Sequence, residues 1–200
     1  MNPEIITADH LDAAIRMVED ADLVKFLYHI FSGDTLHKYL SGRGGRGRHH
    51  GWANGLAFHS VKATILASQI VDHYISIGFD VNKDIVIAGV LLHDIGKIEC
   101  YEYNDDGTKI TYTKANQLFH HIPIGYGIVL MAANEFRKDR NLNEDTLDHL
   151  LHIILSHHGK KAWSSPVIPQ TLEAYIVHSI EMMDGYVESY SRGKIPDRIY

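Results

Sequence analysis

One run without a polar side chain, from Ile85 to Leu92, constrains this chain more than any other stretch. Asn82 stands just before it and is a good residue to cap a helix. Because a helix that is apolar on every side must be buried, we expect this segment at the centre of the fold. The helix ends in His93 and Asp94, and a buried carboxylate is costly unless a metal ion or hydrogen bonds compensate its charge.

Most of the remaining sequence also shows helical spacing. Apolar residues recur every three to four positions in 11–18, which either Thr7 or Asp9 caps, and again in 23–31, which Gly33 is expected to close. Further helices are expected at about 55–77, 115–138, 144–157 and 170–191.

Residues 99–113 alternate in polarity instead and contain Asn-Asp-Asp-Gly at 104–107, a good hairpin turn. We expect two short strands there, with Tyr101, Tyr103 and Tyr112 as cross-strand partners. Cross-strand pairing is therefore the first explanation for the three tyrosines, and base stacking is the second. The predicted fold class is mainly α, a helical bundle with a small β-hairpin near 99–113.

The chain has 200 residues, enough for one domain with a buried core. We expect a single domain over 1–200, made of a helical extension at 1–40, a loop at 41–51 and a helical core at 52–191. The loop carries Arg43, Arg46 and Arg48 among glycines and is followed by His49 and His50. These five residues are candidates for binding substrate phosphates, and a solvated connector is the alternative.

The composition excludes several classes of protein. The formal net charge of −6 argues against a chain that coats nucleic acid through its overall field. The single cysteine, Cys100, excludes an internal disulfide framework and a multi-cysteine metal site. We find no leader-like segment and no apolar run of about 18 residues, so we expect a cytoplasmic protein without membrane contact. The 15 histidines require metal binding, acid–base chemistry or chance as an explanation.

Some of these histidines stand where ligands are useful. His59 lies in the expected helix at 55–77, and His93 and Asp94 end the apolar helix. Histidine also occurs at 121, 157 and 158, and the acids at 181 and 184 share one face of the last helix. Imidazoles and carboxylates are the ligands that borderline and hard divalent cations take from proteins. Since these residues come from five separate segments, spacing alone is a moderate signal.

The segment Leu91-Leu92-His93-Asp94-Ile95-Gly96-Lys97 resembles the signature of the HD superfamily of metal-dependent phosphohydrolases. The histidines at 121, 157 and 158 resemble its two-metal branch. Within that branch the chain is similar to the HD domain of YhaM-type 3′→5′ exoribonucleases over roughly residues 45–190. The stretches that carry this similarity are 49–50, 55–59, 156–159 and 165–169 with Thr171, Glu173, Ala174 and His178.

The resemblance implies a site with two divalent ions, of Mn, Fe, Ni, Mg or Co, that activate water for attack on phosphorus. The implied metal ligands are His59, His93, Asp94, His121, His157, Glu181 and Asp184. Asp94, Lys97 and His158 are the implied catalytic residues. Two departures stand out. The last metal-binding acid of the family is an aspartate, which falls on Glu181 here, and nothing before residue 50 reads as the strands of the family's oligonucleotide-binding barrel.

The expected activity is therefore hydrolysis of phosphoester bonds in nucleotides or single-stranded nucleic acid, most like that of a 3′→5′ exoribonuclease. A phosphohydrolase of free nucleotides on the same scaffold is the first alternative. A non-catalytic nucleotide-binding module is the second, and Glu181 is the feature in its favour. The presence of His93, Asp94 and Lys97 argues against it, because a lapsed site need not keep them. The sequence does not indicate which oligomeric state the protein adopts.

Overall fold

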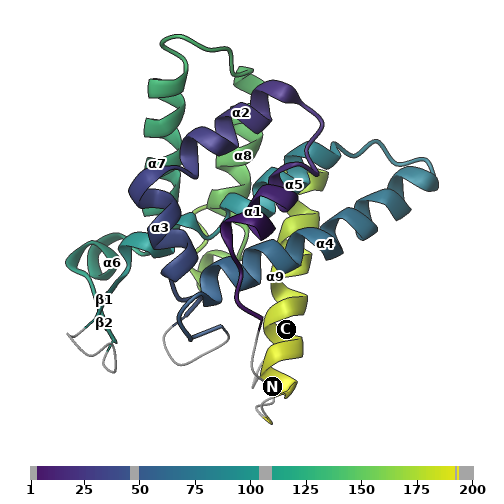
Figure 1. Ribbon diagram of the computed structural model, residues 1–200. Helices are drawn as coiled ribbons and strands as arrows, with labels where there is room; N and C mark the ends of the chain where they lie inside the picture. The colour runs from purple at the N-terminus through teal and green to yellow at the C-terminus, as the bar shows by residue number, and fades with distance from the viewer. Residues whose placement is uncertain (1–3, 46–49, 104–109, 192, 194–200) are drawn as a thin grey trace.

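A computed structural model describes residues 4–45, 50–103, 110–191 and 193. Helices dominate these residues, and two short strands form a small sheet (Figure 1). This confirms the predicted fold class. In chain order the elements are α1 (Ala8–Ile15), α2 (Ala21–Ile30), α3 (Gly33–Ser41), α4 (Gly55–Ser76), α5 (Lys83–Leu92), the 3₁₀ turn η1 (Ile95–Glu99), β1 (Tyr101–Tyr103), β2 (Ile110–Tyr112), α6 (Lys114–Phe119), α7 (His121–Phe136), α8 (Glu144–Ser156), η2 (Lys161–Trp163) and α9 (Leu172–Ser191).

Helix α5 is the centre of the bundle, as its composition predicts. Every residue from Ile85 to Leu92 is buried, and the helix packs against α4, α8 and α9 (Figure 1). The side chain of Asn82 caps its start by accepting a hydrogen bond from the backbone of Ile85. A Cβ atom at Gly89 would lie 2.7 Å from Ile153 of α8, so this glycine lets the two helices approach closely.

The predicted hairpin is present between η1 and α6. Strands β1 and β2 are antiparallel, with Tyr101 opposite Tyr112 and Tyr103 opposite Ile110. The predicted turn at 104–107 lies outside the described residues. At the open end of the hairpin, a hydrogen bond from the Thr113 amide to the Cys100 carbonyl (3.1 Å) joins the residues that flank the two strands.

Gly33 stands at the start of a helix rather than at the end of the preceding one. We expected Gly33 to close the helix at 23–31, but α2 ends at Ile30 and Gly33 is the first residue of α3. Ser32 is extended and Gly33 has a φ of +51°, so these two residues redirect the chain instead of ending the helical region. Tyr39 anchors α3, because its buried hydroxyl donates to the Leu91 carbonyl of α5 (2.9 Å).

The prediction of a single helix at 115–138 is wrong. The structure divides this segment into α6 and α7 at His120 (φ +60°). Pro123 supplies the reason, because it has no amide hydrogen to donate to the carbonyl of Phe119. The break makes His121 the first residue of α7.

Among the residues that the structure describes, no helix combines the length and apolar character needed to cross a bilayer.

Candidate metal centre

His59, His93, Asp94 and Glu181 come from three segments of the chain and meet in the buried centre of the fold. His59 lies near the start of α4, His93 and Asp94 follow α5 directly, and Glu181 is on α9. The Nε2 atom of His59 is 2.8 Å from Glu181 Oε2 and 3.1 Å from the Nε2 atom of His93. The Nε2 atom of His93 is 3.5 Å from Asp94 Oδ2. Each of these four side chains offers one ligand atom that lies within 4.8 Å of the other three. Because two of the four carry a carboxylate, we call this set of residues the carboxylate group of the site.

A second set of ring nitrogens lies on the other side of Asp94. His121 begins α7, and His157 and His158 follow α8. The Nε2 atoms of His121 and His157 are 3.3 and 3.7 Å from Asp94 Oδ1. The three rings, the histidine group of the site, also place their ligand atoms within 4.8 Å of one another. Asp94 therefore turns one oxygen toward each group.

Two glycines bring His121 to this position. A Cβ atom at Gly96 would lie 2.0 Å from the His121 carbonyl and 2.5 Å from the Gly125 amide nitrogen. Only a residue without a side chain allows η1 to approach the start of α7 so closely. This contact sets His121 beside the end of α5.

Backbone carbonyls determine which nitrogen of several rings carries the proton. The Nδ1 atom of His93 donates to the Val90 carbonyl (2.7 Å) and that of His157 to the Ile154 carbonyl (2.8 Å). The Nδ1 atom of His158 donates to the Trp163 carbonyl (2.7 Å). Because a carbonyl only accepts, Nδ1 holds the hydrogen and a neutral ring offers its lone pair at Nε2. Histidines that bind metals in proteins have this arrangement.

The donors at the centre fit divalent metal ions. Within the described residues, the buried Asp94 Oδ1 and Glu181 Oε2 atoms receive no hydrogen bond of good geometry. Buried oxygens without a donor are costly. A cation coordinated by nitrogen and oxygen ligands would satisfy both oxygens and the ring nitrogens that face them.

The pKa values of the histidines differ between the two groups. Burial alone lowers the pKa of His59, but the carboxylates of Glu181 and Asp184 outweigh burial and raise it to about 10. Asp94 and Glu181 similarly outweigh burial at His93 and raise its pKa to about 9. In the histidine group burial prevails, so the pKa of His121 falls to about 3 and that of His157 lies well below its ordinary value. The carboxylate group attracts positive charge, and the histidine group stays neutral.

Lys97 brings a buried positive charge to the centre. The 3₁₀ geometry of η1 places residues three apart above one another, and Lys97 Nζ donates to Asp94 Oδ2. Burial opposes the charge, but Asp94 and Glu181 outweigh it and raise the pKa of the ammonium. Lys97, which the resemblance implies as a catalytic residue, therefore lies beside Asp94.

Asp184 and His50 lie behind His59, outside both groups. The Oδ2 atom of Asp184 is 2.7 Å from His59 Nδ1 and also 2.7 Å from His50 Nε2. His50, which the sequence predicts on a substrate-binding loop, is buried, and its backbone amide donates to Glu188 of α9 (3.0 Å). This geometry favours an orienting role for Asp184, since it holds the nitrogen of His59 that points away from the centre.

His178, one turn before Glu181 in the sequence, supports the site through the backbone of His157. Its Nδ1 atom donates to the carbonyl of His157 (2.7 Å). Its ring fills the space beside Gly159 (φ +75°), where a Cβ atom would lie 2.2 Å from it. The signal in the sequence was the glycine directly after the two histidines, together with a histidine one turn before Glu181.

Of the five loop residues predicted to bind substrate, the structure describes Arg43 and His50. The Nη1 atom of Arg43 donates to the Gly51 carbonyl (2.7 Å), and its guanidinium lies 5.6 Å from the centre of the Tyr103 ring. Arg46, Arg48 and His49 lie outside the described residues. The assignment of these arginines to substrate binding stays a prediction.

Comparison with known proteins agrees with this geometry. A family model described as "HD domain" matches residues 56–183. The chain is 36% identical over 159 residues to "3'-5' exoribonuclease YhaM" of Geobacillus sp. (strain WCH70), covering 76% of this chain and 46% of that protein. The protein of that name from Bacillus licheniformis is 37% identical over 159 residues, covering 76% and 47%. The chain spans about half the length of these curated relatives. No solved structure matches it significantly.

Proposed function

The chain belongs to the HD domain family, and from this membership and the geometry around Asp94 we propose that it is a metal-dependent phosphohydrolase that acts like a 3′→5′ exoribonuclease. The observation that supports this most is the position of Asp94, whose two oxygens face two separate sets of histidine nitrogens. A carboxylate in this position can serve two ions at once, as in enzymes that cleave phosphoesters with paired metals.

We assign one ion to His59, His93, Asp94 and Glu181, and a second to Asp94, His121 and His157. Such ions, when bound, polarise a phosphate and lower the pKa of water. The glutamate at 181 suits this role, because its Oε2 atom lies 2.8 Å from His59 Nε2 and 3.4 Å from His93 Nε2. Asp184 orients His59 from behind through its Nδ1 atom.

Lys97 and His158 supply the remaining chemistry. Lys97 holds a fixed positive charge beside Asp94, where it offsets the negative charge of a phosphate oxygen. His158 keeps its proton on Nδ1 through the Trp163 carbonyl, and burial lowers the pKa of the ring. Its Nε2 atom can therefore accept a proton from the attacking water and return it to the leaving oxygen.

Single-stranded RNA is the substrate class that we propose, because the relatives that cover most of this chain carry the name exoribonuclease. Free nucleotides are the competing substrate on the same scaffold. The two differ in the length of chain that the protein must hold beyond the scissile phosphate.

Activity against a substrate panel tests the proposal. The purified protein is incubated with Mn²⁺, Mg²⁺, Ni²⁺ or Fe²⁺ and end-labelled RNA, DNA, mononucleotides or a small nitrophenyl phosphodiester. We expect stepwise shortening of RNA from its 3′ end and retention of this activity in Asp148→Asn, an exposed control on α8. Absence of phosphoester hydrolysis with every metal would overturn the proposed function.

A further inference from the structure

Three tyrosines share one face of the hairpin. Tyr101 and Tyr103 are two residues apart on β1, so their side chains point to the same side of the sheet. Tyr112 is paired directly with Tyr101 and therefore lies on that side too. The Tyr101 and Tyr112 rings have centroids 5.8 Å apart and planes inclined by 32°. We call these three residues the tyrosine face.

The tyrosine face begins beside the metal centre. Tyr101 is separated from η1, which carries Lys97, by Cys100 alone. Burial raises the pKa of its phenol to about 12, and the charges of Lys97 and Asp94 act on it as well. From Tyr101 the face runs outward, because Tyr103 and Tyr112 are 45% and 39% exposed.

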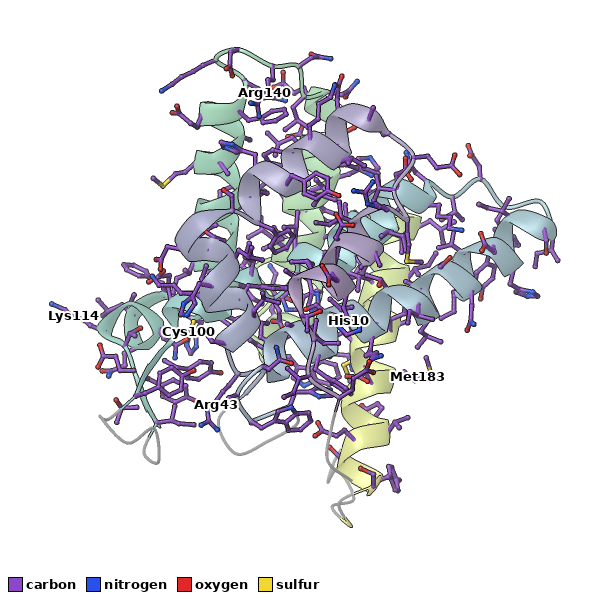
Figure 2. The ribbon with its side chains drawn as sticks, viewed as in Figure 1. His10, Arg43, Cys100, Lys114, Arg140 and Met183 are labelled. Atoms are coloured by element: carbon purple, nitrogen blue, oxygen red, sulfur yellow. The ribbon has the colours of Figure 1, made fainter. Side chains whose placement is uncertain are left out.

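Arg43 adds a positive charge at the outer end of this face. Its guanidinium lies 5.6 Å from the Tyr103 ring centroid, and the Gly51 carbonyl holds it in place. Figure 2 labels Arg43 below Cys100, the residue before β1. The acidic residue of the strand, Glu102, is exposed and paired with Thr111, so it points to the opposite side of the sheet.

Pairing between strands does not account for the whole arrangement. Tyr101 and Tyr112 are cross-strand partners, but Tyr103 faces Ile110 and keeps nearly half of its surface exposed next to an arginine. Exposed aromatic rings interleaved with arginine are the usual surface for single-stranded nucleic acid, since every base has a flat face to stack and every linkage carries a negative charge.

We propose that the tyrosine face and Arg43 form a stacking platform for the nucleobases of a single strand whose terminal phosphodiester lies at the metal centre. This inference rests on the proposed function. The rings stack on the bases, and Arg43 binds the backbone phosphate that lies beyond them. A duplex does not fit the platform, because its bases are already stacked on one another.

Binding of a phosphorothioate oligonucleotide, which resists hydrolysis, tests the platform in the full chain. Fluorescence anisotropy with a labelled single-stranded 10-mer gives Kd for the wild type and its variants. We expect Tyr103→Ala to weaken binding about tenfold, the loss of one stacked base, and Tyr103→Phe to bind as the wild type does. Tyr190→Ala, an exposed tyrosine on α9, is the matched control and should leave Kd unchanged.

Catalysis gives a second measure. For Tyr103→Ala, the ratio of kcat/KM on RNA to kcat/KM on the small phosphodiester should fall about tenfold, mainly through KM on RNA. Equal binding by Tyr103→Ala and the wild type would overturn the platform. Equal losses in Tyr103→Phe and Tyr103→Ala would also overturn it, since the phenol hydroxyl, and not the stacking ring, would then be what matters. If the oligonucleotide binds through Tyr103 but no phosphoester is cleaved, the platform stands and the proposed function fails.

Discussion

The two halves of the candidate metal centre share Asp94 but differ in charge. In the carboxylate group, His59 and His93 lie beside the carboxylates of Asp94 and Glu181, and their pKa values are raised to about 10 and about 9. In the histidine group, one oxygen of Asp94 faces two of the three rings, and burial lowers the pKa of His121 to about 3. One half is built to attract a cation, and the other is built from neutral donors.

This difference predicts that the two ions bind with unequal strength. Carboxylates add Coulomb attraction to coordination, and this attraction is large in a buried site. Neutral imidazoles contribute coordination alone, and His121 is the least buried of the proposed ligands. We expect a tightly held ion in the carboxylate group and a readily exchanged ion in the histidine group.

The largest effect should come from Asp94→Asn, which removes the charge that both halves share. We expect elemental analysis to find neither ion and kcat/KM to fall by about 10³-fold or more, since paired metals supply several kcal/mol of transition-state stabilisation. Asp148→Asn, an exposed aspartate on α8, should retain both ions.

Asp94→Asn also leaves Lys97 buried without its partner, which costs about 3–5 kcal/mol of folding free energy. The double variant Asp94→Asn, Lys97→Met removes both charges and separates metal loss from unfolding. Thermal melting should show a higher Tm for the double variant than for Asp94→Asn. Two ions retained in the folded double variant would contradict our assignment of Asp94.

Graded chelation should separate the two ions. As the concentration of chelator rises, metal content per chain should fall in two steps, with activity lost in the first. In His121→Gln the first step should be absent while the second remains. In Glu181→Gln the second step should shift to lower chelator concentration. Loss of both ions in a single step from the wild type would contradict the unequal binding that we expect for the two ions.

Asp184→Asn should weaken the carboxylate group alone. The amide keeps the size of the carboxylate but loses the charge that holds His59 through Nδ1. Residues that orient a metal-binding histidine typically affect metal affinity by about 10–100-fold. Competition with a metal indicator should show this loss for the tight ion and an unchanged affinity for the weak one. A loss confined to the weak ion would contradict the position that we give to Asp184.

The sequence predicted the parts of this molecule that depend on local pattern. The apolar run from Ile85 to Leu92 required burial, and His93 and Asp94 at its end required compensation of charge, which placed the centre of the site. The break at His120 was missed, although Pro123 marks it. The burial of His50 depends on partners more than 100 positions away on α9, and no local pattern contains that information.

The smallest effect should come from His178→Phe, which tests the histidine group. Phenylalanine keeps the ring that packs beside Gly159 but removes the Nδ1 donor to the His157 carbonyl. One hydrogen bond of this kind contributes about 1 kcal/mol, so affinity for the weak ion should fall by about fivefold. The same indicator competition should show an unchanged tight ion, because His178 contacts the backbone of His157 and Asp184 holds the other half. If His178→Phe weakened the tight ion instead, the two halves would share their support through α9, and their difference would then lie in charge alone.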